Sequence, residues 1–87
     1  MVDSSDKRAL WEQLVAHLQE RAKASVNVLR EKDSDLMIIG SNKEMTVTFD
    51  PDRSAVRWET ANEYGLEKLQ EPLSGLAVRL MQSFLLH

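Results

Sequence analysis

The chain has 87 residues, a formal net charge of −3 and no cysteine. This length allows one domain with a single hydrophobic core, and the lack of thiols excludes disulfides, zinc–thiolate sites and cysteine catalysis. The mildly acidic balance, 14 acidic against 11 basic residues, provides no electrostatic attraction to nucleic acid or to anionic lipid.

The N-terminal segment, residues 5–26, has the periodicity of an amphipathic helix. Its apolar residues recur every three or four positions and fall on one side of a helical wheel. They are Leu10, Trp11, Leu14, Val15, Leu18 and Ala22. Ser4 or Ser5 can cap the start. The end is open to two interpretations, a helix that continues to about residue 30 or a stop near Asn27 followed by a strand over 28–31. We favour the strand, because it gives the next apolar segment an antiparallel neighbour.

That next segment contains four consecutive apolar residues, Leu36, Met37, Ile38 and Ile39. Because successive side chains of a strand point to opposite faces, such a segment places apolar groups on both faces of a sheet. The following turn decides which pair faces the core. A three-residue loop selects Met37 and Ile39, whereas a two-residue loop selects Leu36 and Ile38. In either register two large aliphatic side chains remain on the other face.

Residues 44–59 predict a β-hairpin. One face of its two strands is apolar and the other polar, as alternation requires. The apolar positions are Met45, Val47, Phe49, Val56 and Trp58, and the polar ones are Thr46, Thr48, Arg57 and Glu59. Asp50 and Pro51 suit the first two positions of a type I turn. Residues 61–70 include Gly65 and predict a loop or a single helical turn.

From Pro72 to Leu86 the sequence predicts a second helix, since proline is tolerated at the first helical position. It has two apolar stripes. One consists of Leu73, Leu76, Ala77, Leu80 and Phe84, and the other of Val78, Met81 and Leu85. The second stripe lies about 100–120° from the first. It either packs between the sheet and the first helix or contacts another chain.

These elements predict one α+β domain, residues 1–87, in which an antiparallel meander of three or four strands is flanked by an N-terminal and a C-terminal helix (α-β-β-β-β-α). Both helices need the same apolar face of the sheet. The face of Thr46 and Thr48 would then be open, with two aliphatic side chains from residues 36–39 standing in it.

No catalytic, cofactor-binding or metal-binding residues are predicted. His17 has neither a cysteine nor an acid four residues later to form a metal-binding pair. The acidic segments 33–35 and 50–52 lack the further ligands of a calcium loop and suit turns. A nucleophile elbow and a glycine-rich phosphate loop are both missing. We therefore expect that the protein is not an enzyme.

The surplus of apolar surface predicts a non-catalytic protein–protein interaction module. A second copy of the chain is the simplest partner, which makes a homodimer the first expectation, and another protein is the alternative partner. The expected interface consists of Leu36, Met37, Ile38, Ile39, Val78, Met81 and Leu85. One alternative function is a small ligand-binding domain with an apolar pocket between the C-terminal helix and the sheet. The other is nucleic-acid binding, which the charge favours least. No apolar run approaches the ~18–20 residues of a membrane span, and we expect a soluble, cytoplasmic protein.

Overall fold

The computed structural model describes residues 4–86, which form an α+β fold with two helices and one sheet of five strands. The elements in chain order are α1 (Ser4–Glu20), β1 (Asn27–Lys32), β2 (Asp35–Ile39), β3 (Glu44–Asp50), β4 (Ala55–Glu59), β5 (Tyr64–Lys68) and α2 (Leu73–Leu86). A single 3-10 turn, Pro51–Arg53, joins β3 to β4. The strands are antiparallel and lie in sequence order from β1 to β5. The predicted capping side chains of Ser4 and Ser5 lie outside the described part.

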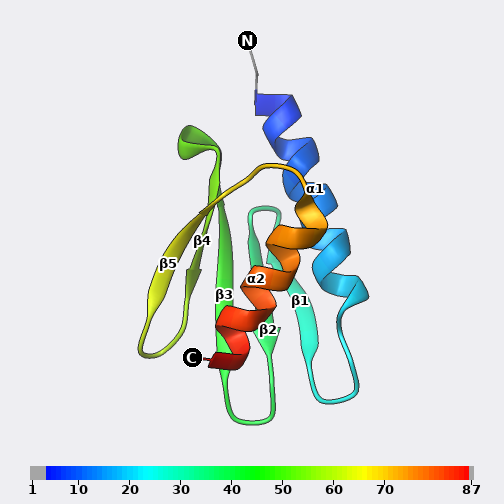
Figure 1. Cartoon of the computed structure of the whole chain (residues 1–87), viewed down its shortest axis with the longest axis vertical. Coiled ribbons are helices and arrows are strands. Elements are labelled where there is room, and N and C mark those ends of the chain that lie inside the picture. Colours follow the sequence, from blue (N-terminus) through cyan, green and yellow to red (C-terminus); the bar gives the residue numbers. More distant parts are fainter. Residues whose placement is uncertain (1–3, 87) are drawn as a thin grey trace.

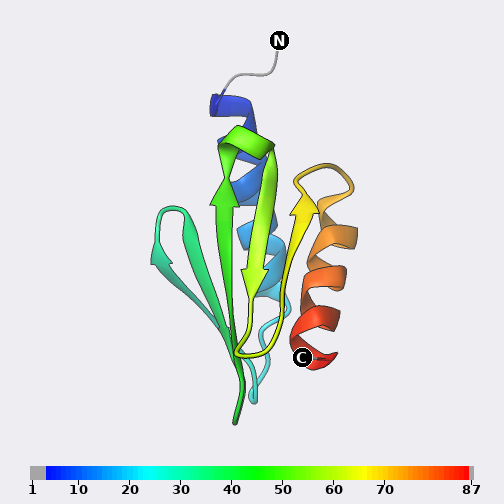
Figure 2. The same ribbon diagram turned by 90° about the vertical axis from the view of Figure 1, so that its left-hand side faces the viewer.

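Both helices pack on one face of the sheet, as predicted. In Figure 1, α2 crosses in front of the middle strands and α1 lies beside it, toward β1. Figure 2 shows the twist of the sheet, which carries the β1–β2 turn and β5 to opposite sides of the view. The core lies between the layers and consists of Trp11, Leu14, Val15, Leu18, Leu36, Ile38, Met45, Val47, Phe49, Val56, Trp58, Leu69, Leu73, Leu76, Ala77, Leu80 and Phe84.

The register of the central hairpins decides which residues enter this core. Across β3 and β4, Val47 is paired with Trp58, so the predicted apolar face is confirmed. Between β2 and β3, the Gly40 N–H donates to the Lys43 carbonyl at 2.8 Å, which leaves a two-residue loop. Leu36 and Ile38 therefore face the core and are fully buried, whereas their neighbours in β2 point to the opposite face.

The first helix is shorter than predicted, because it ends at Glu20 and not at residue 26. Lys23 and Val26 form an isolated β-bridge with reciprocal backbone hydrogen bonds of 2.9 and 3.0 Å. This tight turn reverses the chain, so the next residues pair with β2. The strand interpretation of residues 28–31 is confirmed.

The sheet has a fifth strand, β5, that the prediction of three or four strands did not include. It occupies the segment expected to be a loop or a helical turn. Thr60 closes the β4–β5 turn: its N–H donates to the Glu63 carbonyl at 2.8 Å, and its hydroxyl accepts the Glu63 N–H at 3.0 Å. Gly65 is then paired with Trp58. A Cβ atom at Gly65 would lie 2.5 Å from the indole ring. The glycine therefore allows the ring to lie against the backbone of β5, which explains its place inside a strand.

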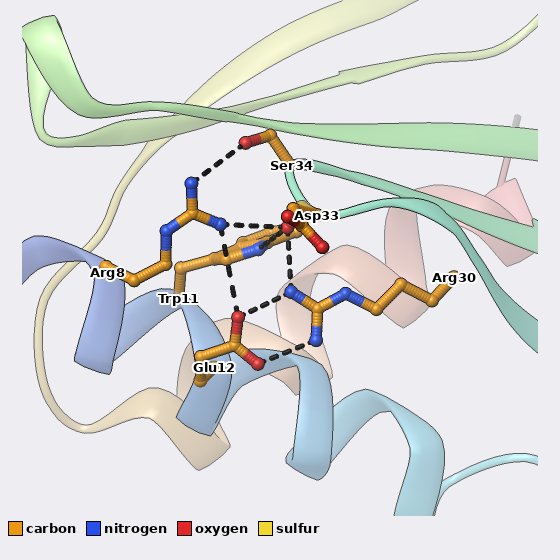
Figure 3. A network of polar contacts seen from close by, with 6 residues as sticks. All are labelled: Arg8, Trp11, Glu12, Arg30, Asp33 and Ser34. Carbon is orange, nitrogen blue, oxygen red and sulfur yellow. Dashed lines mark hydrogen bonds and ion pairs between the residues drawn. The ribbon is translucent and has the colours of Figure 1, made fainter.

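A group of polar contacts ties α1 to the β1–β2 turn (Figure 3). The carbonyl oxygen of Asp33 accepts three hydrogen bonds, from the Trp11 indole at 2.8 Å, from Arg30 at 2.7 Å and from Arg8 at 3.0 Å. Arg30 also forms a two-pronged ion pair with Glu12 on α1. The Asp33 carbonyl accepts hydrogen bonds from side chains of both α1 and β1, and these bonds fix the position of the β1–β2 turn relative to α1.

The Glu12–Arg30 pair gives stability a defined pH dependence. Hydrogen bonding to Arg30 lowers the pKa of Glu12 below its ordinary value of 4.5. Because the folded-state pKa is the lower one, the ionised carboxylate stabilises the protein above pH 4.5, and this contribution is lost as the pH falls through the folded-state pKa. We expect Glu12→Gln to be less stable than the wild type at neutral pH by about 0.2–1 kcal/mol, because the pair is partly exposed.

Urea unfolding at a series of pH values measures this difference. It should shrink toward zero well below pH 4.5. In an Arg30→Met background the same Glu12→Gln substitution should have a smaller effect at neutral pH. An unchanged effect in that background would show that Arg30 does not stabilise the carboxylate.

Candidate functional site

The face of the sheet opposite the helices is the candidate site. The strand register places on it Leu29, Met37, Ile39, Thr46, Thr48, Arg57, Glu59, Tyr64 and Leu66. We call these nine residues the open face, because both helices lie on the other side of the sheet (Figures 1 and 2). Alternation in the strands puts them there, since each is an immediate neighbour of a residue that faces the helices.

The open face is apolar at its two ends and polar in the middle. Leu29 is 48% exposed at the β1 end, and Tyr64 and Leu66 are 81% and 54% exposed on β5. Between the two ends, β3 and β4 contribute hydroxyl and charged groups. A surface that combines exposed aromatic and aliphatic groups with neighbouring polar groups has the composition of a protein-binding surface.

Shallow depressions open to solvent lie on this surface. One is lined by Thr46, Thr48, Arg57, Glu59 and Tyr64, among others. Another lies between the β2–β3 and β4–β5 turns and includes Ile39. Neither encloses a small molecule as a buried pocket does. Within the described residues, no group of three or more histidine, cysteine, aspartate or glutamate side chains could hold a metal ion. The arrangement is suited to contact with another protein surface.

The structure divides the predicted interface residues. Leu36 and Ile38 do not belong to a surface, since the two-residue β2–β3 loop turns both into the core. Met37 and Ile39 stand half-buried on the open face, where one pair of aliphatic side chains was expected. The second face of β2 therefore carries apolar groups that the helices do not cover.

The predicted stripe on α2 lies on the other side of the sheet. Val78 and Leu85 are 39% and 64% exposed, and Met81 packs partly against the core. The α2 stripe is thus not fully enclosed by the described part of the chain. The structure does not bring it together with Met37 and Ile39, and an interface that uses it stays a prediction. The first stripe of α2 is buried throughout, as expected.

The exposed apolar members of the open face were not predicted. Tyr64 and Leu66 alternate around Gly65 in a segment that was expected to be a loop, and Leu29 lies on a strand whose existence was one of two alternatives. The sequence does carry one indication of a strand here, because Tyr64 and Leu66 alternate with Gly65 and Glu67. The pattern is short and includes a glycine, so it predicts a strand only weakly.

The alternative site, an apolar pocket between α2 and the sheet, coincides with the packed core. Leu76, Leu80 and Phe84 of α2 are buried in the same cluster as Val47 and Trp58 of the sheet. Side chains from the two layers occupy this space, and the depressions described above lie on the open face instead.

Comparison with known proteins finds no family model, no curated protein and no solved structure that matches this chain. Within residues 4–86, the helices lack the length and apolar character that crossing a bilayer requires.

Proposed function

We propose that the protein is a non-catalytic protein–protein interaction module that forms a homodimer in the cytoplasm. The observation that carries this proposal is the pair of large apolar side chains on β5, Tyr64 and Leu66, which are 81% and 54% exposed at the end of an uncovered sheet face. The cytoplasmic setting is supported by the lack of cysteine.

A second copy is the partner that this surface fits best. Two-fold contacts place the same patch on both sides of an interface, so an apolar patch meets an apolar patch. Full burial of a large apolar side chain contributes about 1.5–3 kcal/mol. Even partial burial of two such side chains from each subunit adds to the free energy that a stable dimer needs. The polar residues of β3 and β4 would remain at the rim of the contact.

The oligomeric state in solution tests this proposal. We expect the wild type to be a dimer in light scattering and sedimentation equilibrium. Leu66→Lys should weaken the dimer about tenfold or more, because it removes apolar contact and places an ammonium group from each subunit in the contact. The matched control is Leu29→Lys, a similarly exposed leucine at the other end of the open face, which should remain dimeric. A wild type that is monomeric up to about 1 mM, where even a contact of about 4 kcal/mol half-populates the dimer, would contradict the proposal.

A further inference from the structure

The two outer strands of the sheet differ in how their edges are protected. On β1 the register shifts between Arg30 and Lys32, which marks a bulge, and the Arg30 side chain is tied to Glu12 of α1. Bulges, charges and a neighbouring helix are devices that prevent an edge from pairing. Strand β5 pairs with β4 in an unbroken register from Tyr64 to Lys68, and Figure 1 shows no helix or strand of residues 4–86 beyond it. The β5 edge is therefore the one available to another strand.

The hydrogen bonds at the two ends of the β4–β5 pair show which backbone groups are free. The Thr60 N–H donates to the Glu63 carbonyl at 2.8 Å, and the Leu69 N–H donates to the Ser54 carbonyl at 2.9 Å. Both bonds follow the register of the strands between them. In an antiparallel pair, hydrogen-bonded and non-hydrogen-bonded residue pairs alternate. Every second residue from Glu63 to Leu69, a segment that contains β5, therefore bonds to β4 or to a residue that flanks it.

Gly65 and Glu67 belong to this bonded set. Tyr64, Leu66 and Lys68 consequently direct their N–H and C=O groups away from β4, toward the free edge. The same three residues carry their side chains on the open face or at its margin. The edge thus presents donors, acceptors, an aromatic ring, an aliphatic group and an ammonium in a fixed order.

We propose that two copies of the chain pair their β5 strands antiparallel, with the two-fold axis at Leu66, to form one continuous sheet. This inference rests on the proposed homodimer and specifies its geometry. In this register Leu66 lies opposite Leu66 of the partner subunit, and Tyr64 lies opposite Lys68 of the partner subunit. The axis is perpendicular to the sheet, so the helices of both subunits lie on the same face and the two open faces join into one.

The register follows from the outward groups and from charge. A two-fold axis at Gly65, Leu66 or Glu67 sets outward-pointing residues opposite one another. The axis at Leu66 pairs all three of them and forms about six backbone hydrogen bonds. An axis at Glu67 places two carboxylates directly opposite, which is unfavourable. An axis at Gly65 leaves Lys68 beyond the paired segment.

The side chains complement one another in the chosen register. On the open face the two leucines meet at the axis, and each Tyr64 ring lies beside an ammonium, an arrangement that favours cation–π attraction. On the helix side Glu67 keeps its contact with Arg79 at 3.3 Å. Opposite it stands Gly65 of the partner subunit, which has no side chain to obstruct that carboxylate.

A charge series at Tyr64 of the full-length protein tests the register. Tyr64 is 81% exposed, so substitutions there should leave the fold intact. Tyr64→Glu places a carboxylate opposite Lys68 of the partner subunit, whereas Tyr64→Lys places an ammonium there. We expect the dissociation constant of Tyr64→Lys to exceed that of Tyr64→Glu by about two- to thirtyfold at low salt, because each dimer contains two such pairs. Adding Lys68→Glu to Tyr64→Lys should recover the affinity, and raising the salt concentration should reduce the difference.

Leu66→Pro tests the hydrogen bonds. It removes an outward N–H and leaves the bonds to β4 in place, as proline on an edge strand permits, and we expect it to be monomeric. Equal affinities of the two Tyr64 variants, or a Leu66→Pro protein that dimerises like the wild type, would overturn the β5 pairing. If Leu66→Pro does not fold, as shown by circular dichroism, the Tyr64 series decides.

These outcomes separate the two proposals. A dimer that Leu66→Lys dissociates but that does not distinguish Tyr64→Glu from Tyr64→Lys supports the interaction module and refutes the edge pairing. A wild type that stays monomeric refutes both.

Discussion

Replacing Trp11 with alanine is expected to lower the free energy of unfolding by about 3–5 kcal/mol. The side chain is fully buried, stacks on Phe49 with a centroid distance of 5.6 Å, and donates its indole N–H to the Asp33 carbonyl at 2.8 Å. The substitution therefore removes a large part of the core and one of the contacts that hold the β1–β2 turn. Because a domain of this size has a total stability of only about 5–10 kcal/mol, the variant should be close to unfolding at room temperature.

Urea denaturation followed by far-ultraviolet circular dichroism measures this loss without depending on tryptophan fluorescence. Trp11→Phe is the matched control, since it keeps an aromatic ring beside Phe49 and loses the N–H donor. The Asp33 carbonyl would still accept hydrogen bonds from Arg8 and Arg30. We expect the control to lose about 1–2 kcal/mol. If the two variants are equally stable, ring packing at this position does not contribute as described.

Replacing Gly65 with alanine is expected to destabilise the protein by about 1–3 kcal/mol, the range for overpacking a core. The new Cβ would lie 2.5 Å from ring atoms of Trp58, which is too close for any carbon contact. Either the indole or strand β5 has to move. Movement of the strand would also disturb the free edge, so the variant should be compared with the wild type at one fixed protein concentration.

Gly75→Ala is the same chemical change as Gly65→Ala, but we expect it to raise the stability of the protein. Gly75 lies inside α2, where a Cβ would meet only Pro72 and Arg79 at 3.5 and 3.8 Å. Alanine favours a helix over glycine by about 0.8–1 kcal/mol, so we expect this variant to be more stable than the wild type. A stabilised or neutral Gly65→Ala would show that Trp58 does not need the space above Gly65. The loss at Gly65 should diminish in a Trp58→Leu background.

The parts of the fold that the sequence predicted are those in which one element carries a complete pattern. In β3, Met45, Val47 and Phe49 alternate with polar residues over the whole strand. This pattern assigns all three apolar side chains to the face that packs in the core. The tight stripe of α2 is similarly complete, and its five members are all buried. Periodicity identifies such elements because several residues agree on the same face.

The remaining features depend on contacts between distant residues. The apolar period of α1 continues past Glu20, and only the Lys23–Val26 bridge and the pairing of β1 with β2 end the helix there. Strand β5 includes a glycine that appears unfavourable until Trp58 is seen to lie against it. For the candidate site, an aliphatic pair on the open face of β2 was predicted, but the β5 end was not, because the strand that carries Tyr64 was not recognised.

The order of the strands has a consequence for the rate of folding. Each strand pairs with the next one along the chain, and each connection between neighbouring strands is a short turn. Such sequence-local contacts require little loop closure before they form, and chains rich in them fold quickly. The docking of α1 against α2 is different, because the whole sheet separates these helices in the chain. The slowest step of folding should therefore be the docking of α1 against α2 on a sheet that has already formed.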